Sequence, residues 1–139
     1  DTGKSTSTVR STAAPAATLG GELLSVEITP KDPTNSRLKI DAAYTYSGNQ
    51  VTQYCMLLTQ TGESNAIAAT ANRLASDNTF GEMGLTHDIP TPTSGTLTFS
   101  VRVGSSISGS MYLNGLSTPI FGDNIFPAVL TVEEYIEET

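Results

Sequence analysis

Cysteine, tryptophan, charge and long apolar runs are all scarce in this chain of 139 residues, and each scarcity excludes a class of protein. The single cysteine, Cys55, rules out an internal disulfide framework. No apolar run approaches the roughly 18 residues that a membrane-spanning helix needs, and no signal-peptide pattern opens the chain. The sequence also lacks an Asn-x-Ser/Thr sequon, so nothing indicates a glycosylated secreted protein.

Charged residues make up only 15% of the chain and aromatic residues 6%, whereas Ser and Thr outnumber the charged residues. Abundant Thr suits strands with one wet face, because β-branched side chains fit a half-buried pleated surface. A helical surface would carry more Glu, Lys and Ala in mixed register. The composition therefore favours an all-β domain with a modest core.

The net charge of −7 is unevenly placed, with −8 in residues 40–139 and +1 in residues 1–39. Such a surface repels phosphate backbones, whose neutralisation supplies most non-specific affinity for nucleic acid. It also repels anionic lipid headgroups. We therefore expect no nucleic-acid partner and no direct lipid insertion by this domain.

Short stretches with a period of two, separated by Pro, Gly and Asn, indicate about eight strands. Because Asp1 is not a natural start, we expect a piece of a longer protein, with residues 1–20 as an arm or linker and 21–139 as the folded domain. Within the arm, Thr8–Ser11 is a candidate short strand. The expected strands of the domain are residues 23–29, 38–44, 53–59, 66–71, 80–89, 96–103, 111–113 and 128–136. Closely spaced strands of this kind predict a sandwich or barrel.

Three stretches together resemble the head domains of bacteriophage tail needles and tail fibres. They are ITPKDPTNSRLKI at residues 28–40, TFSVRVGS at 98–105 with MYLNG at 111–115, and IFG at 120–122 with AVLTVEEY at 128–135. The resemblance spans residues 23–136 and lies in strand spacing and Ser/Thr/Gly character. It implies a homotrimeric jelly-roll sandwich of tumour-necrosis-factor-like topology, on the virion at the tail tip. The implied partners are two further copies of the chain and a bacterial cell-surface receptor, with a glycan among the candidates.

A lean core and an arm of small residues independently favour a trimer, because association would bury further apolar surface. Tyr is common where one edge of a side chain stays polar. The candidates for the trimer interface are Tyr44, Tyr46, Tyr54, Arg102, Phe126, Tyr135 and Ile136. The alternative for the aromatic and aliphatic residues is that they fill the core of one protomer. Arg102 is either a solvent-facing strand residue or part of an inter-protomer salt bridge or anion site.

The sequence offers little for catalysis, so we expect a binding protein and not an enzyme. Adjacent strand residues point to opposite faces, so Asp88 is poorly placed to orient the only histidine, His87. Cys55 lies in an apolar stretch without a neighbouring basic residue and reads as an inert thiol. One His and one Cys cannot make a zinc site alone. We expect no catalytic residue, no cofactor and no metal site.

Three functions stay open at this point. The first is a tail-tip domain that contacts the host cell surface during attachment and genome delivery. The second is a purely structural trimerisation cap on a fibrous shaft. The third is a tail-associated polysaccharide hydrolase, which would need two facing carboxylates about 5–9.5 Å apart. The acidic end of the chain predicts only a solvated terminus, at Glu133, Glu134, Glu137 and Glu138.

Overall fold

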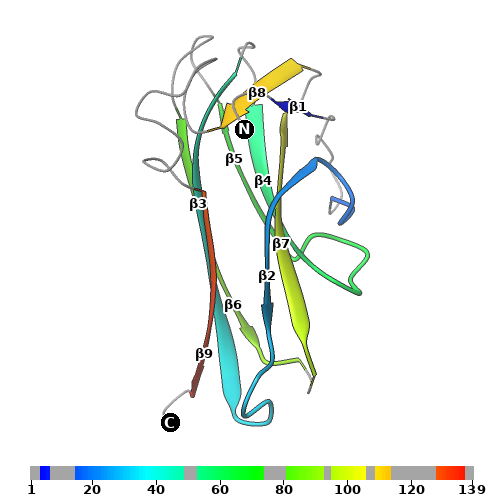
Figure 1. Cartoon of the computed structure of the whole chain (residues 1–139), viewed down its shortest axis with the longest axis vertical. Helices are drawn as coiled ribbons and strands as arrows, with labels where there is room; N and C mark the ends of the chain where they lie inside the picture. Colours follow the sequence, from blue (N-terminus) through cyan, green and yellow to red (C-terminus); the bar gives the residue numbers. More distant parts are fainter. Residues whose placement is uncertain are drawn as a thin grey trace.

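A computed structural model describes residues 4–6, 15–48, 53–73, 81–92, 95–105, 109–113 and 128–136. Within these ranges the chain forms nine β-strands and no helix, so the all-β prediction is confirmed (Figure 1). The strands are β1 Lys4–Thr6, β2 Gly21–Ile28, β3 Ser36–Gly48, β4 Gln53–Gln60, β5 Ala68–Arg73, β6 Gly81–Pro90, β7 Leu97–Ser105, β8 Gly109–Leu113 and β9 Val129–Ile136.

Each strand expected from the alternation pattern is present, with shifted ends. The strand expected at residues 66–71 is β5, which begins and ends two residues later and pairs along β4. Within the expected arm, Lys4–Thr6 forms β1 and pairs with β8. The candidate strand Thr8–Ser11 lies outside the described residues.

The strands form two antiparallel sheets. One has the order β2-β7-β4-β5, and the other has the order β1-β8-β3-β6, with β9 also paired to β3. The long strand β3 pairs with β6 along one edge, and β9 and β8 share its other edge. The pairs β1–β8, β2–β7, β3–β6 and β4–β5 are nested, as if one long hairpin had been folded over on itself.

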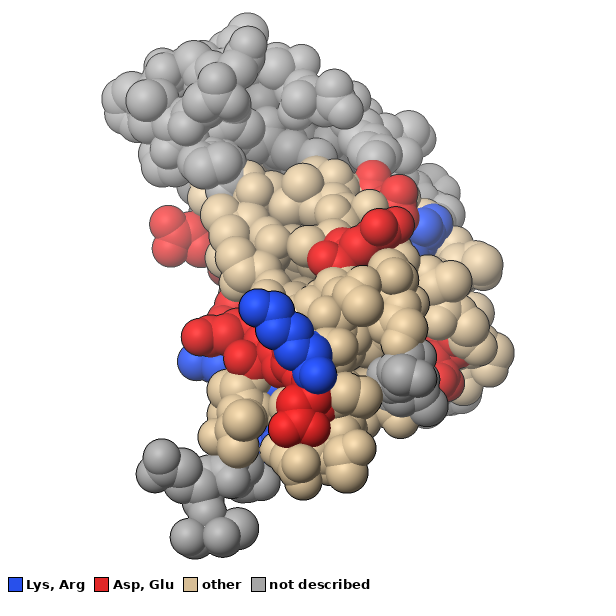
Figure 2. Space-filling model, turned by 60° about the horizontal axis from the view of Figure 1, so that its bottom comes forward, with Lys and Arg blue, Asp and Glu red and all other residues tan. Residues whose placement is uncertain are grey.

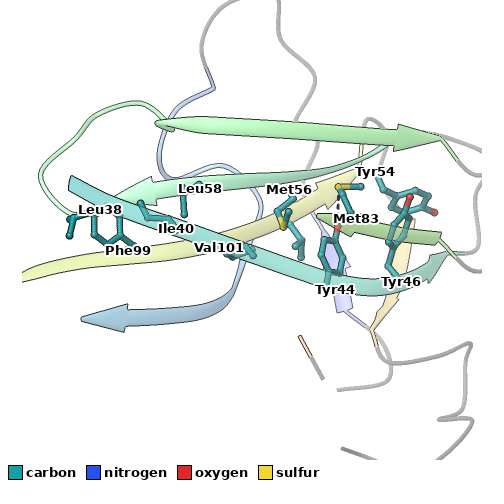
Figure 3. Packing of buried hydrophobic residues seen from close by; sticks show 12 residues of the cluster. Leu38, Ile40, Tyr44, Tyr46, Tyr54, Met56, Leu58, Met83, Phe99 and Val101 are labelled. Carbon is teal, nitrogen blue, oxygen red and sulfur yellow. Dashed lines mark hydrogen bonds between the residues drawn. The ribbon is translucent and has the colours of Figure 1, made fainter. Parts of the chain in front are cut away.

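The core lies between the two sheets and changes character along its length (Figure 3). One end is built from aliphatic side chains and Phe99, and the other end from the tilted, adjoining rings of Tyr44, Tyr46 and Tyr54. The fully buried members include Leu38, Tyr46, Tyr54, Met56, Leu58, Phe99 and Val103. These side chains recur at every second position of their strands, which is what a two-layer β structure requires.

The turn between β2 and β3 is fixed by short-range hydrogen bonds. Pro30 follows the end of β2 and is buried. The Asp32 backbone oxygen accepts from the Ser36 N–H at 3.1 Å, and its carboxylate accepts from the Asn35 amide nitrogen at 3.3 Å. The side chain of a turn Asp commonly bonds in this way a few residues on. This turn lies at the end of the sandwich where β9 also ends (Figure 1).

Candidate interaction surface

The outer face of the β9–β3–β6 sheet is a surface of three paired strands that faces away from the core. Leu38, Ile40 and Ala42 of β3 point into the core, so the residues between them point outward. The residues of β6 and β9 that pair with them across the sheet point to the same outer side. Together the outward residues are Arg37, Lys39, Asp41, Ala43 and Thr45 of β3, Glu82, Gly84, Thr86 and Asp88 of β6, and Val129, Thr131, Glu133 and Tyr135 of β9.

The centre of this face is shallow because its residues are small. Ala43 stands between Gly84 on one side and Val129 on the other in a single row across the sheet. Two adjoining depressions meet over Ala43 and Gly84. Val129 borders one of them and is 44% exposed, which is unusual for a large apolar side chain in a strand. We refer to Ala43, Gly84 and Val129 as the small-residue row.

A charged cluster lies on the same face toward the end of β9. The Arg37 Nε donates to an Asp88 carboxylate oxygen at 2.6 Å, and the Tyr135 hydroxyl donates to the other oxygen. The hydrogen bond from Tyr135, followed by that from Arg37, lowers the pKa of Asp88. The same carboxylate raises the pKa of Tyr135. The cluster connects all three strands, since each residue comes from a different one.

Polar residues surround the small-residue row. In the next row along the sheet, the Thr86 hydroxyl donates to the Asp41 carboxylate at 2.7 Å. Further carboxylates on this face, at Glu82 and Glu133, outweigh the charge of Lys39. Viewed from the end that carries the C-terminus, the described surface shows acidic groups with few basic ones between them (Figure 2). An apolar centre with a polar rim is the usual anatomy of a protein interface.

Glu134 corrects the expectation of a solvated acidic terminus. Its carboxylate accepts the backbone N–H groups of Lys31 and Asp32, both at 2.8 Å, and the Ser36 hydroxyl at 2.8 Å. The two backbone hydrogen bonds are the main reason that the pKa of Glu134 is lowered. Glu134 thereby ties the last strand to the β2–β3 turn. Glu137 and Glu138 lie outside the described residues.

Three of the predicted interface residues lie in the core of the single chain. Tyr44, Tyr46 and Tyr54 are 4%, 0% and 1% exposed, so they present no surface to a neighbour. For these three the alternative prediction, that they fill the protomer core, is the one that the structure bears out. The sequence pattern already indicated that Tyr44 and Tyr46 face the core, because they continue the alternation of Leu38 and Ile40.

Among the described residues, the other predicted interface residues fall on two different sheets. Tyr135 is on the outer face described above, and Ile136 at the end of β9 is 63% exposed. Arg102 lies on the opposite sheet, where its guanidinium donates to backbone oxygens of residues 18–20. It is therefore neither a freely solvated side chain nor close to Tyr135. Phe126 lies outside the described residues.

The residues with catalytic potential do not converge. His87 pairs with the core-facing Ile40 and Asp88 with the outward Lys39, so the two neighbours point to opposite faces as predicted. Cys55 is half-buried, and burial raises the pKa of its thiol. The described ranges contain no group of three or more His, Cys, Asp or Glu side chains that could hold a metal ion. In the same ranges no helix is long and apolar enough to cross a membrane.

The Arg37–Asp88–Tyr135 cluster and the Glu134 contacts could not be inferred from local patterns. Asp88 lies 51 residues from Arg37 and 47 from Tyr135, and Glu134 lies 103 from Lys31. No motif connects residues at such separations. No protein-family model matches the chain, and no curated protein matches its sequence.

Proposed function

We propose that this chain is a bacteriophage virion domain, the head of a tail needle or tail fibre, which contacts the host cell surface during attachment and genome delivery. In this proposal the domain is a homotrimeric jelly roll of tumour-necrosis-factor-like topology. It acts by recognition and not by catalysis, and it works outside the cell as part of the tail tip.

The observation that carries the proposal is the nested pairing of the strands. Rolling up one antiparallel hairpin of eight strands produces sheets of order 1-8-3-6 and 2-7-4-5, which is the jelly-roll connectivity. The orders β1-β8-β3-β6 and β2-β7-β4-β5 agree with it, with β8 and β9 sharing the place of the eighth strand. Jelly rolls are frequent in viral structural proteins, so this order supports the resemblance to phage tail-tip heads.

The outer face of the β9–β3–β6 sheet is the surface that we assign to contact between protomers. Its small-residue row lets a neighbouring backbone approach closely, and the exposed Val129 gains from being covered. The other sheet is less suitable because residues 15–20 already lie against its Arg102. Closed cyclic symmetry would repeat one contact three times and leave no open face of this kind.

Recognition of the host would rest on several weak contacts. Three identical heads on one axis present every loop three times, and repeated surface sugars or proteins then bind by multivalency. Loops held by a rigid sandwich are common places for such contacts. The described turn around Asp32 is one such rigid element, since Glu134 and Asn35 both bind to it.

The first test is the molar mass in solution, measured by light scattering coupled to size exclusion. We expect three times the 14.6 kDa of one chain. In the variant Ala43→Glu, a charge placed in the small-residue row should convert the trimer to monomer while the circular dichroism spectrum stays that of a β protein. The matched control is Ala69→Glu, at an exposed alanine facing outward on the other sheet. This control should remain trimeric.

A monomeric wild-type chain at micromolar concentration would refute the trimer, and a trimeric Ala43→Glu variant would refute the assigned surface. Binding of the labelled domain to whole host cells or to a glycan array tests recognition separately. Binding that weakens when the trimer is broken supports the receptor-contacting role. A stable trimer without binding to any candidate host would favour the structural cap.

A further inference from the structure

Residues 15–20 form a short segment that lies against the outer side of the β2–β7–β4–β5 sheet. The Ala17 N–H donates to the Ser64 oxygen at 2.9 Å, and the Ala66 N–H donates to the Pro15 oxygen at 2.8 Å. Between them, Ala16 and Asn65 form an isolated antiparallel bridge. The segment is thus attached at one end to the connection between β4 and β5. We call residues 15–20 the strap.

Arg102 holds the other end of the strap. Its Nε donates to the Leu19 oxygen at 2.8 Å, and one terminal nitrogen donates to the oxygens of Gly20 at 2.7 Å and Thr18 at 3.1 Å. Three successive carbonyl groups therefore converge on a single guanidinium. Hydrogen bonds from a charged donor are about twice as strong as neutral ones, and the planar fork of Arg matches several acceptors at once.

Gly20 brings the strap into close contact with the backbone of β7. It has a φ of 73°, a conformation that residues with a side chain rarely adopt. A Cβ atom at this position would lie 2.6 Å from the Val103 oxygen. The end of the strap consequently fits only as glycine. This contact and the Arg102 hydrogen bonds are independent features that fix the same end.

Leu57 indicates what the strap covers. It faces away from the core cluster, because its neighbours Met56 and Leu58 belong to that cluster and Leu57 does not. It is nevertheless only 2% exposed. Its register partner on β7 is Arg102, and such partners have Cβ atoms about 5 Å apart. The side chains of Leu57 and Arg102 therefore leave the sheet side by side, and the guanidinium of Arg102 binds the strap.

Leu57 is the largest apolar side chain on this part of the outer face. Its outward neighbours Cys55 on β4 and Ala69 and Ala71 on β5 are small and carry no charge. Apolar area is costly to leave in water. Because Leu57 is buried on an outward face beside Arg102, we assign its cover to the strap that Arg102 binds.

We propose that residues 15–20 are a strap that Arg102 holds closed over Leu57, and that this strap opens as a unit while both sheets stay folded. At its first end the strap is held by backbone hydrogen bonds to Ser64 and Ala66, whereas the strands are held by continuous ladders. The strap also lies in the covalent path from β1 in one sheet to β2 in the other. The device does not depend on the proposed viral function.

Amide hydrogen exchange tests the proposal on the full chain. In Arg102→Ala, the amides of Ala17, Leu19 and Ala66 should exchange at least about tenfold faster, because several charge-assisted hydrogen bonds are lost. The amides shared between β3 and β6 should keep their wild-type rates. The matched control is Arg73→Ala, at an exposed arginine on β5 of the same sheet, which should change neither set.

Thiol labelling gives a second measurement that does not depend on exchange. In a Cys55→Ala background, the thiol introduced by Leu57→Cys should react slowly with an aromatic disulfide reagent, and adding Arg102→Ala should accelerate the reaction at least about tenfold. Arg102→Lys should fall between, since an ammonium has donors on a single nitrogen and lacks the planar fork that reaches the three carbonyl groups from separate nitrogens. Wild-type exchange rates of the strap in Arg102→Ala would overturn the proposal. Equal acceleration in the strap and in the β3–β6 ladder would also overturn it, because the strap would then not open separately.

Discussion

The buried hydroxyl of Tyr46 allows a prediction whose sign is opposite to the usual effect of a core substitution. The ring of Tyr46 is 0% exposed, and its centroid lies 5.3 Å from those of both Tyr44 and Tyr54. Among the described residues its hydroxyl has no hydrogen-bond partner. Burial raises the pKa of Tyr46, and the nearby Asn72 side chain partly opposes this shift. By distance and angle the hydroxyl is nevertheless buried without a hydrogen bond among these residues.

The expected gain from Tyr46→Phe follows from two opposing terms. An unsatisfied buried hydroxyl costs about 1–3 kcal/mol, which the substitution recovers. The void left by one oxygen is roughly 10 Å³, and at about 24 cal/mol per Å³ it costs only about 0.2 kcal/mol. The ring stays in place, so the stacking with Tyr44 and Tyr54 is kept. Tyr46→Phe should raise the free energy of unfolding by about 1 kcal/mol, and the melting temperature by about 3–5 °C.

Tyr44 is the matched control because its ring belongs to the same stack. Its hydroxyl has one proton to donate and two acceptors within reach, the Cys55 oxygen at 3.4 Å and the Met83 sulfur at 3.8 Å (Figure 3). Both contacts are long, so Tyr44→Phe should lower the free energy of unfolding by about 0.5–1 kcal/mol. Urea unfolding followed by fluorescence at one protein concentration measures both variants. If Tyr46→Phe destabilises the domain as much as Tyr44→Phe does, the hydroxyl of Tyr46 has a partner and the reasoning is wrong.

Two further predictions concern the packing and the acid end of the molecule. Gly48→Ala should destabilise the domain by about 1–3 kcal/mol, because the added Cβ would lie 1.8 Å from the Tyr54 hydroxyl. Gly84→Ala should leave the stability of the protomer unchanged, since the nearest atom to its added Cβ is 3.8 Å away. Thermal unfolding compares the two variants. The pKa values of Asp88 and Glu134 are lower in the folded domain than in the unfolded chain, where they are about 3.9 and 4.3. Both carboxylates therefore stabilise the fold at pH values above these unfolded pKa values. They lose that contribution as the pH falls through the folded pKa values. Urea midpoints should therefore drop between pH 5 and pH 3, and less steeply in Glu134→Gln; identical pH profiles for the two proteins would contradict the assignment.

The strands are the part of the fold that the amino-acid pattern predicts well. A side chain alternates between the two faces of a strand with a period of two, so Leu97, Phe99, Val101 and Val103 reveal their strand without reference to any other segment. Turns follow from Pro and Gly for the same local reason, as at Pro30. The alternation also places Tyr44 and Tyr46 on the same face of their strand as Ile40. It does not distinguish burial of that face inside one protomer from burial between protomers.

The contacts that characterise the surfaces were decided by tertiary structure alone. Arg102 binds residues more than 80 positions away, and Asp88 meets Arg37 and Tyr135 only because β3 lies between β6 and β9. The order of the strands in a sheet depends on which strand edges pair. A strand alternates with a period of two whichever strand it pairs with, so the alternation does not reveal its partner. The composition and alternation of this sequence thus determine an all-β chain and most of its strands. The order of the strands, the small-residue row and the strap follow from long-range packing, because the residues involved become neighbours only after the sheets have formed.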